Sequence, residues 1–297
     1  MKRTDLALEA RELWQERGAS ELPPGARGET REDAGSTVET LEIASPEAAQ
    51  ALGKPEGRYI TLFPEAFLRR EEGAFEAAAG LLGRLLRALL GLTEGASVLV
   101  AGLGNEAITP DSLGPRTLRH VLATRHLVSA LPETFGAFRR VAVLETGVLG
   151  NTGMESAELV KAVAEKLRPD AVIAVDALAS RRLGRICRTV QLTDTGIIPG
   201  SGVGNARSEL SRETLGVPVV GLGVPTVVDA ATLASDLTEL SGMGDVRPED
   251  FGAHGAGMMV TPREIDQQTA LMARLLGYGI DLALHDLGVG DVTALIG

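Results

Sequence analysis

Cysteine, aromatic residues and lysine are scarce in this 297-residue chain. Cys187 is the only cysteine, so one chain can form neither an internal disulfide nor a thiolate metal cage. Aromatic residues make up 3% of the chain, so its core must consist mainly of Ala, Val, Leu and Ile. Only four of the 29 basic residues are lysines, and the rest are arginines.

Positive charge is also in deficit, because the formal net charge is −11. Nucleic-acid binding needs clustered Lys and Arg facing phosphate, so a direct nucleic-acid partner is disfavoured. No apolar run reaches membrane-spanning length, and the N-terminus is charged from Lys2 and Arg3 onward. These features predict no membrane association and a cytoplasmic, reducing compartment.

Short apolar runs alternate with helical patterns over most of the chain. Strands are predicted at Ser97–Gly102, Arg140–Leu144, Ala171–Val175, Thr189–Leu192 and Val217–Leu222. Helices are predicted at Phe75–Leu92, Leu113–Ala123, Met154–Leu167, Val228–Leu240 and Pro262–Leu284. This alternation is typical of the α/β class, with a mostly parallel twisted sheet covered by helices on both faces.

The first 63 residues follow a different pattern. A helix is predicted over 6–16, and the Gly-, Pro- and charge-rich stretch 18–37 is predicted to be a flexible linker or loop. Alternating residues at Val38–Ile43 and Tyr59–Phe63 predict two strands. Residues 38–63 are therefore expected to form a small antiparallel β unit ahead of the main sheet.

Two aspartates, Asp111 and Asp176, follow the predicted strands Ser97–Gly102 and Ala171–Val175. In open α/β sheets, ligands bind beyond the carboxyl ends of the strands. If these strands are neighbours, both carboxylates reach one crevice, where they could activate water by general acid–base chemistry. Glu145, which also follows a predicted strand, adds a third carboxylate near this edge.

Each aspartate also has a purely structural interpretation. Asp111 precedes a predicted helix and could be its N-cap. Asp176 could bond to nearby backbone amides at the end of its strand. Two such aspartates after two βα strands are harder to explain as separate structural features, so the pair is the predicted catalytic site.

Other motifs give weaker signals. The turn Gly102-Leu103-Gly104-Asn105 resembles a dinucleotide-binding turn, but Ile108-Thr109-Pro110 interrupts the helix that should follow, so a backbone turn is favoured. Ser201 does not lie at a strand-to-helix elbow, and Cys187 is expected to be a core residue. The loop Gly200–Asn205 could cradle an anion, and the loop residue His254 has no placed partner. No cofactor and no metal site is predicted.

Several longer segments carry a family resemblance. They are Arg3–Ala10, Gly57–Leu62, Val100–Asn105, Thr109–Pro115, Thr124–Leu127, Ala174–Arg181, Asp194–Asn205, Val224–Ala230 and Met259–Asp266. On these segments the chain resembles the germination protease family of endospore-forming bacteria, which are aspartic-type endopeptidases outside the pepsin fold. The resemblance extends, in order, over nearly the whole chain.

The resemblance implies that Asp111 and Asp176 are the essential aspartates. It also implies an α/β core related to the hydrogenase-maturation peptidases, and a homotetramer. The implied substrates are small acid-soluble spore proteins, which coat DNA in the dormant spore, so the expected location is the cytoplasm of the spore core.

The family is made as a zymogen that removes its own propeptide, and its substrates are cut after an acidic residue in a T-E-[FI]-A-S-E-like stretch. Thr4–Glu9 resembles that stretch. Self-cleavage is therefore expected between Asp5 and Leu6, with 1–5 as a short propeptide and 6–297 as a single peptidase domain. A charged helix start with Thr4 as its N-cap is the structural alternative.

Two other functions remain open on the sequence alone. A nickel-dependent peptidase of the hydrogenase-maturation type would need a histidine near the two carboxylates, for which His126 and His254 are candidates. A non-enzymatic nucleotide- or cofactor-binding module would use the turn Gly102–Asn105. The favoured mechanism has Asp111 and Asp176 sharing one proton, because two close carboxylates cannot both ionise at low cost.

Overall fold

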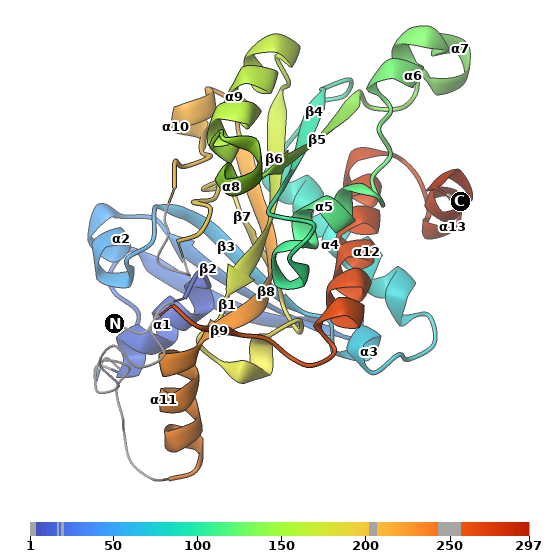
Figure 1. Cartoon of the computed structure of the whole chain (residues 1–297). Helices are drawn as coiled ribbons and strands as arrows, with labels where there is room; N and C mark the ends of the chain where they lie inside the picture. Colours follow the sequence, from blue (N-terminus) through green and yellow to red (C-terminus); the bar gives the residue numbers. More distant parts are fainter. Residues whose placement is uncertain (1–3, 17, 19–20, 202–206, 243–256, 297) are drawn as a thin grey trace.

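The fold is an α/β structure built around one nine-stranded sheet (Figure 1). The computed structural model describes residues 4–16, 18, 21–201, 207–242 and 257–296. Four strands run parallel in the order β5 (Val141–Gly147), β4 (Val98–Leu103), β6 (Ala171–Ala179) and β8 (Val219–Asp229). These are four of the five apolar runs predicted as strands, and β4, β6 and β8 are buried on both faces, as expected for a covered parallel sheet.

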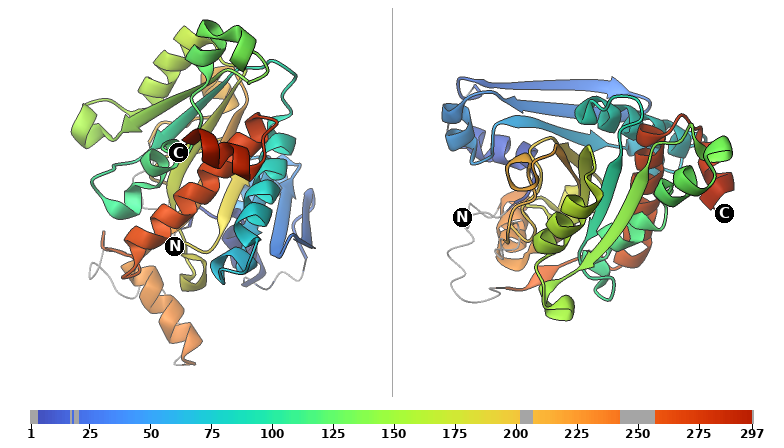
Figure 2. Two further views of the ribbon diagram at one scale, coloured as in Figure 1. Left: turned by 90° about the vertical axis from the view of Figure 1, so that its right-hand side faces the viewer. Right: turned by 90° about the horizontal axis from the view of Figure 1, so that it is seen from above.

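The sheet continues beyond β8 with antiparallel strands. They are β7 (Val190–Thr193), β3 (Gly57–Phe63), β2 (Ser36–Ile43) and β1 (Ala26–Asp33), and the short β9 (Met259–Val260) pairs with the end of β8. The predicted antiparallel unit of residues 38–63 is therefore present, and β3 joins it directly to the main sheet through β7. Seen from above, the blue β1–β3 part turns away from the parallel strands, which reflects the twist of the sheet (Figure 2).

The prediction that 18–37 is a linker or loop is wrong for its second half. Residues Ala26–Asp33 form β1, which pairs residue by residue with β2. The two strands are joined at Ala34 and Gly35, both in the left-handed region at φ 51° and 69°. This tight turn lacks the Asn-Gly or Asp-Gly signal of a hairpin, and β1 is polar and largely exposed, so its stability comes from backbone pairing with β2.

Alternate residues of the parallel strands face two separate cores. Val98 and Val100 of β4 face a core shared with α4 (Ala74–Leu90), α5 (Leu113–Leu118) and α12 (Ile265–Leu284). Leu99 and Ala101 face a smaller core under α9 (Ser156–Leu167). Figures 1 and 2 show these helices on opposite faces of the sheet, so the predicted α/β architecture is confirmed.

The remaining elements are short connections and peripheral helices. They are α2 (Pro46–Leu52), α3 (Glu65–Leu68), η1 (Thr109–Asp111), α6 (Arg125–Ala130), α7 (Pro132–Phe135), α8 (Leu149–Thr152), η2 (Leu183–Arg185), α10 (Arg212–Leu215), α11 (Ala230–Leu240) and α13 (Val289–Ile296). α5 ends at Leu118, before its predicted end at Ala123. Within the described ranges, the helices are too short or too polar for any of them to span a bilayer.

The N-terminal helix α1 (Ala7–Glu16) is tied to the segment that follows β6. Arg181, almost fully buried, donates to Glu16 at 2.8 Å. Arg185 lies 2.8 Å from Glu9 and also pairs with Glu12. Since Glu9, Glu12 and Glu16 share one helix face, these contacts fix α1 beside the carboxyl end of β6.

Candidate active site

Asp111 lies on the short helix η1, between the end of β4 and the start of α5. Gly104 has φ +106°, and a Cβ there would come within 2.0 Å of the Asp111 carbonyl oxygen, so only glycine allows this close approach. The Asn105 N–H donates to the Asp111 carboxylate at 2.8 Å. The alternative that Asp111 is a helix N-cap is wrong, because Ser112 holds that position and α5 has no side-chain cap. Gly102 and Leu103 still belong to β4, and the chain turns away from the sheet at Gly104, so only the second half of the predicted Gly102–Asn105 turn is a turn.

Asp176 lies within β6, which extends beyond it to Ala179, so its expected position after the strand's end is corrected. The prediction ended the strand too early because an acidic residue interrupts the apolar run. Asp176 is 5% exposed, and its carboxylate accepts a hydrogen bond from the Ala177 N–H at 2.9 Å. This local bond matches the structural interpretation, but it leaves the rest of the carboxyl group facing a cavity.

Both aspartates line one cavity of about 580 Å³. They meet there because β4 and β6 are adjacent and parallel, with Gly102 opposite Val175. Asp5, Arg207 and Asp229 also line this cavity. The structure therefore brings together the two aspartates that the sequence singled out.

The electrostatics of the two carboxyl groups differ. Burial raises the pKa of Asp176 well above its usual value, and the nearby Asp111 and Asp5 raise it further. Burial also raises the pKa of Asp111, but the Asn105 N–H and the positive charge of Arg207 oppose that rise. Asp176 is thus the member of the pair that favours the protonated form, and Asp111 is the one that ionises more readily.

Other carboxylates near this edge have different roles. Asp229 caps α11 by accepting from the Thr232 N–H at 3.0 Å. Glu145 is exposed on the edge strand β5 and does not line the cavity, although the sequence suggested it as a third carboxylate there. Arg207, which sequence reasoning missed, lines the cavity and pairs with Glu155 at 3.0 Å.

The third carboxylate beside Asp176 is that of Asp5. The Asp5 N–H donates to the Ala179 carbonyl at 3.0 Å, and the Ala179 N–H donates to the Asp5 carboxylate at 2.8 Å. The Ser201 hydroxyl donates to the other carboxylate oxygen at 2.5 Å. The residue before the expected self-cleavage bond therefore lies against the end of the strand that carries Asp176.

Some predicted residues lie away from this cavity. His126 is exposed on α6 and does not line it. His254 and the loop residues 202–205 lie outside the described residues. Cys187 is buried, and its burial raises the pKa of the thiol to about 12, which fits its expected place in the core. Among the described side chains, no three His, Cys, Asp or Glu residues are grouped so as to hold a metal ion.

The fold and the cavity define an α/β protein with a paired-carboxylate site at the carboxyl ends of parallel strands, which is suited to hydrolysis by general acid–base catalysis. The family model described as germination protease matches residues 7–241. Similar proteins named germination protease occur in Clostridium perfringens (37% identical, covering 95% of both chains) and Caldanaerobacter subterraneus (41%, covering 95% of this chain and 94% of the relative). A relative of the same name in Clostridium tetani is 38% identical over 99% of both chains.

The chain belongs to the germination protease family. It is accordingly a protease, and a spore protease in particular. The matched range includes Asp111 and Asp176 and begins two residues after Asp5.

Proposed function

We propose that this protease is an aspartic-type endopeptidase that begins the degradation of small acid-soluble spore proteins during germination. The observation that carries the proposal is that Asp111 and Asp176 line one cavity with pKa values raised by burial and, for Asp176, by the other carboxylates. Such a pair can hold one proton between two acids and act on water as base and acid together.

In this mechanism ionised Asp111 takes a proton from water as the water oxygen attacks the carbonyl carbon before the scissile bond. Protonated Asp176 gives its proton to the developing oxyanion. When the tetrahedral intermediate collapses, the hydroxyl proton returns to Asp176, and the leaving amine takes the proton from Asp111. One C–O bond forms, one C–N bond breaks, and both aspartates return to their starting states.

Self-processing between Asp5 and Leu6 is part of the proposal, with 1–5 as the propeptide and 6–297 as the mature domain. Its support is that Asp5 lines the cavity that holds both aspartates. Leu6 is fully buried and directly precedes α1, and the ion pairs of α1 would hold the new N-terminus in place after the cut.

The substrate, assembly and location are proposed on the family resemblance. The spore proteins bind DNA, whereas a net charge of −11 disfavours DNA binding by this chain, so recognition would go through the substrate protein itself. The proposed assembly is a homotetramer and the proposed location is the cytoplasm of the spore core.

The proposal can be tested on a peptide that contains Thr-Asp-Leu-Ala-Leu-Glu, with the products identified by mass spectrometry. Asp111→Asn and Asp176→Asn should each abolish cutting after the aspartate while leaving the protein folded. Asp286→Asn, at an exposed aspartate outside the cavity, is the matched control. Full activity in either cavity variant would remove that residue from the mechanism.

A further inference from the structure

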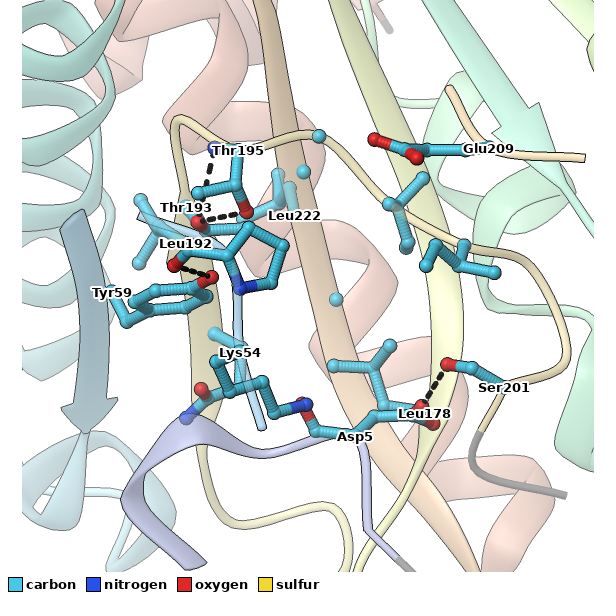
Figure 3. Close-up of a pocket in the computed structure, with 17 residues that line it drawn as sticks. Asp5, Lys54, Tyr59, Leu178, Leu192, Thr193, Thr195, Ser201, Glu209 and Leu222 are labelled. Atoms are coloured by element: carbon cyan, nitrogen blue, oxygen red, sulfur yellow. Dashed lines mark hydrogen bonds between the residues drawn. The ribbon is translucent and has the colours of Figure 1, made fainter. Parts of the chain in front are cut away.

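Asp5 is bound through its main chain as well as its carboxylate. Its N–H and its carboxylate both engage Ala179, and Ser201 donates to the same carboxylate. Its carbonyl oxygen accepts a hydrogen bond from Nζ of Lys54 at 2.8 Å. Figure 3 shows the ends of Asp5 and Lys54 side by side, with Ser201 reaching Asp5 from the opposite side.

Lys54 is held in this position by its local structure. It follows α2, whose C-cap Gly53 adopts φ +63°, and its own N–H donates to the Ala49 carbonyl at 3.2 Å. Burial lowers the pKa of the Lys54 ammonium, and the negative charges of Asp5 and Glu9 oppose that change. An acidic residue at position 5 therefore favours the charged form of the lysine that contacts it.

We infer that Lys54, the Ala179 N–H and the Ser201 hydroxyl form a binding site for the acidic residue that precedes the cleaved bond, and that Lys54 polarises the carbonyl group of that residue. The inference rests on the proposed function. If the bond after Asp5 is cut, the Asp5 carbonyl oxygen is the atom on which negative charge develops. A cation already hydrogen-bonded to that oxygen stabilises the transition state more than the ground state.

The same contacts explain a preference for an acid. A carboxylate accepts from the Ala179 N–H and the Ser201 hydroxyl at once, and its negative charge makes both bonds stronger than those of a neutral asparagine. An asparagine could keep both contacts only with Ser201 as the acceptor, and it would lack the attraction to the Lys54 ammonium. One main-chain hydrogen bond, from the Asp5 N–H to the Ala179 carbonyl, also holds the chain against the end of β6, and main-chain bonds to a strand are a common means of peptide binding. A further cavity of about 110 Å³ beside Asp5, lined also by Lys54, leaves space for the longer side chain of glutamate.

The test compares two peptides, one with Thr-Asp-Leu-Ala-Leu-Glu and one with Asn in place of Asp, cut by the unaltered full chain and its variants. Lys54→Met should lower kcat for the Asp peptide by roughly 10²–10³-fold, the usual loss when one oxyanion donor is removed, with KM nearly unchanged. Lys54→Gln keeps an N–H donor without the charge, so its kcat should lie between that of the unaltered chain and that of Lys54→Met. Ser201→Ala should lower the preference for Asp over Asn by roughly tenfold or more, as expected for a hydrogen bond to a charged group.

Exposed Lys161→Met and Ser208→Ala are the matched controls and should match the unaltered chain. Melting temperatures of all variants separate catalysis from folding, and Lys54→Met should be at least as stable as the unaltered chain because it removes a desolvated charge. A normal kcat in both Lys54 variants overturns this inference and leaves the proposed function standing. Equal loss on both peptides together with a lowered melting temperature also overturns it, because it indicates a structural role. Failure of the unaltered chain to cut the Asp peptide overturns the proposed function as well.

Discussion

The carboxylate of Glu9 lies 2.8 Å from Nη1 of Arg185 and is completely buried. It also accepts hydrogen bonds from the main-chain N–H groups of Arg181 and Arg182, at 2.7 and 3.0 Å, and from the Ser180 hydroxyl at 2.8 Å. Buried charge is tolerated when it is paired and fully hydrogen-bonded in this way. Glu9 thus fixes the N-terminal helix against the segment that follows Asp176 in the chain.

Glu9→Gln should lower the free energy of unfolding by about 1–3 kcal/mol, because the ion pair is lost and an amide N–H faces backbone donors. Self-cleavage should also slow, since Asp5 depends on α1 for its position. Chemical denaturation gives the first quantity, and the mass of the chain over time gives the second. Exposed Glu133→Gln should change neither, and an unaltered stability in Glu9→Gln would contradict this account of α1.

The rate of peptide cleavage should depend on pH with a bell shape. Asp111 must be ionised, and its raised pKa places the acidic limb above the ordinary aspartate value of 3.8. Asp176 must be protonated, and its pKa is raised more strongly, so activity should fall again at higher pH. Measurement of kcat/KM against pH checks both limbs. A rate that stays flat from acid to alkaline pH would contradict proton sharing by the pair.

Asp281 predicts a separate effect on stability. It is fully buried, Oδ1 accepts from the Leu122 N–H at 3.0 Å, and Oδ2 has no hydrogen-bond partner among the residues that the structure describes. Burial raises its pKa to about 7, so the folded state binds this proton more tightly than the unfolded chain does. Stability should therefore fall as pH rises from about 4 to the folded-state pKa.

Asp281→Asn should remove that fall. The variant should be more stable than the unaltered chain above neutral pH, by up to about 4 kcal/mol, and the difference should shrink towards pH of about 4. Thermal unfolding across this range provides the measurement, with exposed Asp286→Asn as control. A variant that is destabilised equally at every pH would show that the second oxygen of Asp281 is not a buried proton site.

The parallel core could be predicted because its strands are buried on both faces. Continuous apolar runs such as Val98–Ala101 and Ala171–Val175 identify such strands without further information. The carboxylate pair followed from topology, since neighbouring parallel strands present their carboxyl ends at one edge. β1 could not be found in this way, because it is polar and depends on pairing with β2.

The other parts of the site depend on contacts between distant segments. Asp5 contacts Ala179 and Ser201, and Lys54 reaches Asp5 from the end of α2. No local pattern in the sequence marks Lys54. The glycine-rich loop that contains Ser201 suggested an anion site, but the sequence does not show that the Asp5 carboxylate is the group bound there. The expectation that Glu145 lies near the two aspartates was wrong for a related reason. Strand-end position gives the edge of the sheet but not the direction of a side chain on the outermost strand.

The central claim is that Asp111 and Asp176 together cut the bond after Asp5 in their own chain. The most direct measurement is the intact mass of the purified full-length chain over time, at several protein concentrations. The account predicts that the unaltered chain loses residues 1–5 at a rate independent of concentration, and that Asp111→Asn and Asp176→Asn chains stay full length even when mixed with active enzyme. Loss of the same five residues by either variant on its own would contradict it.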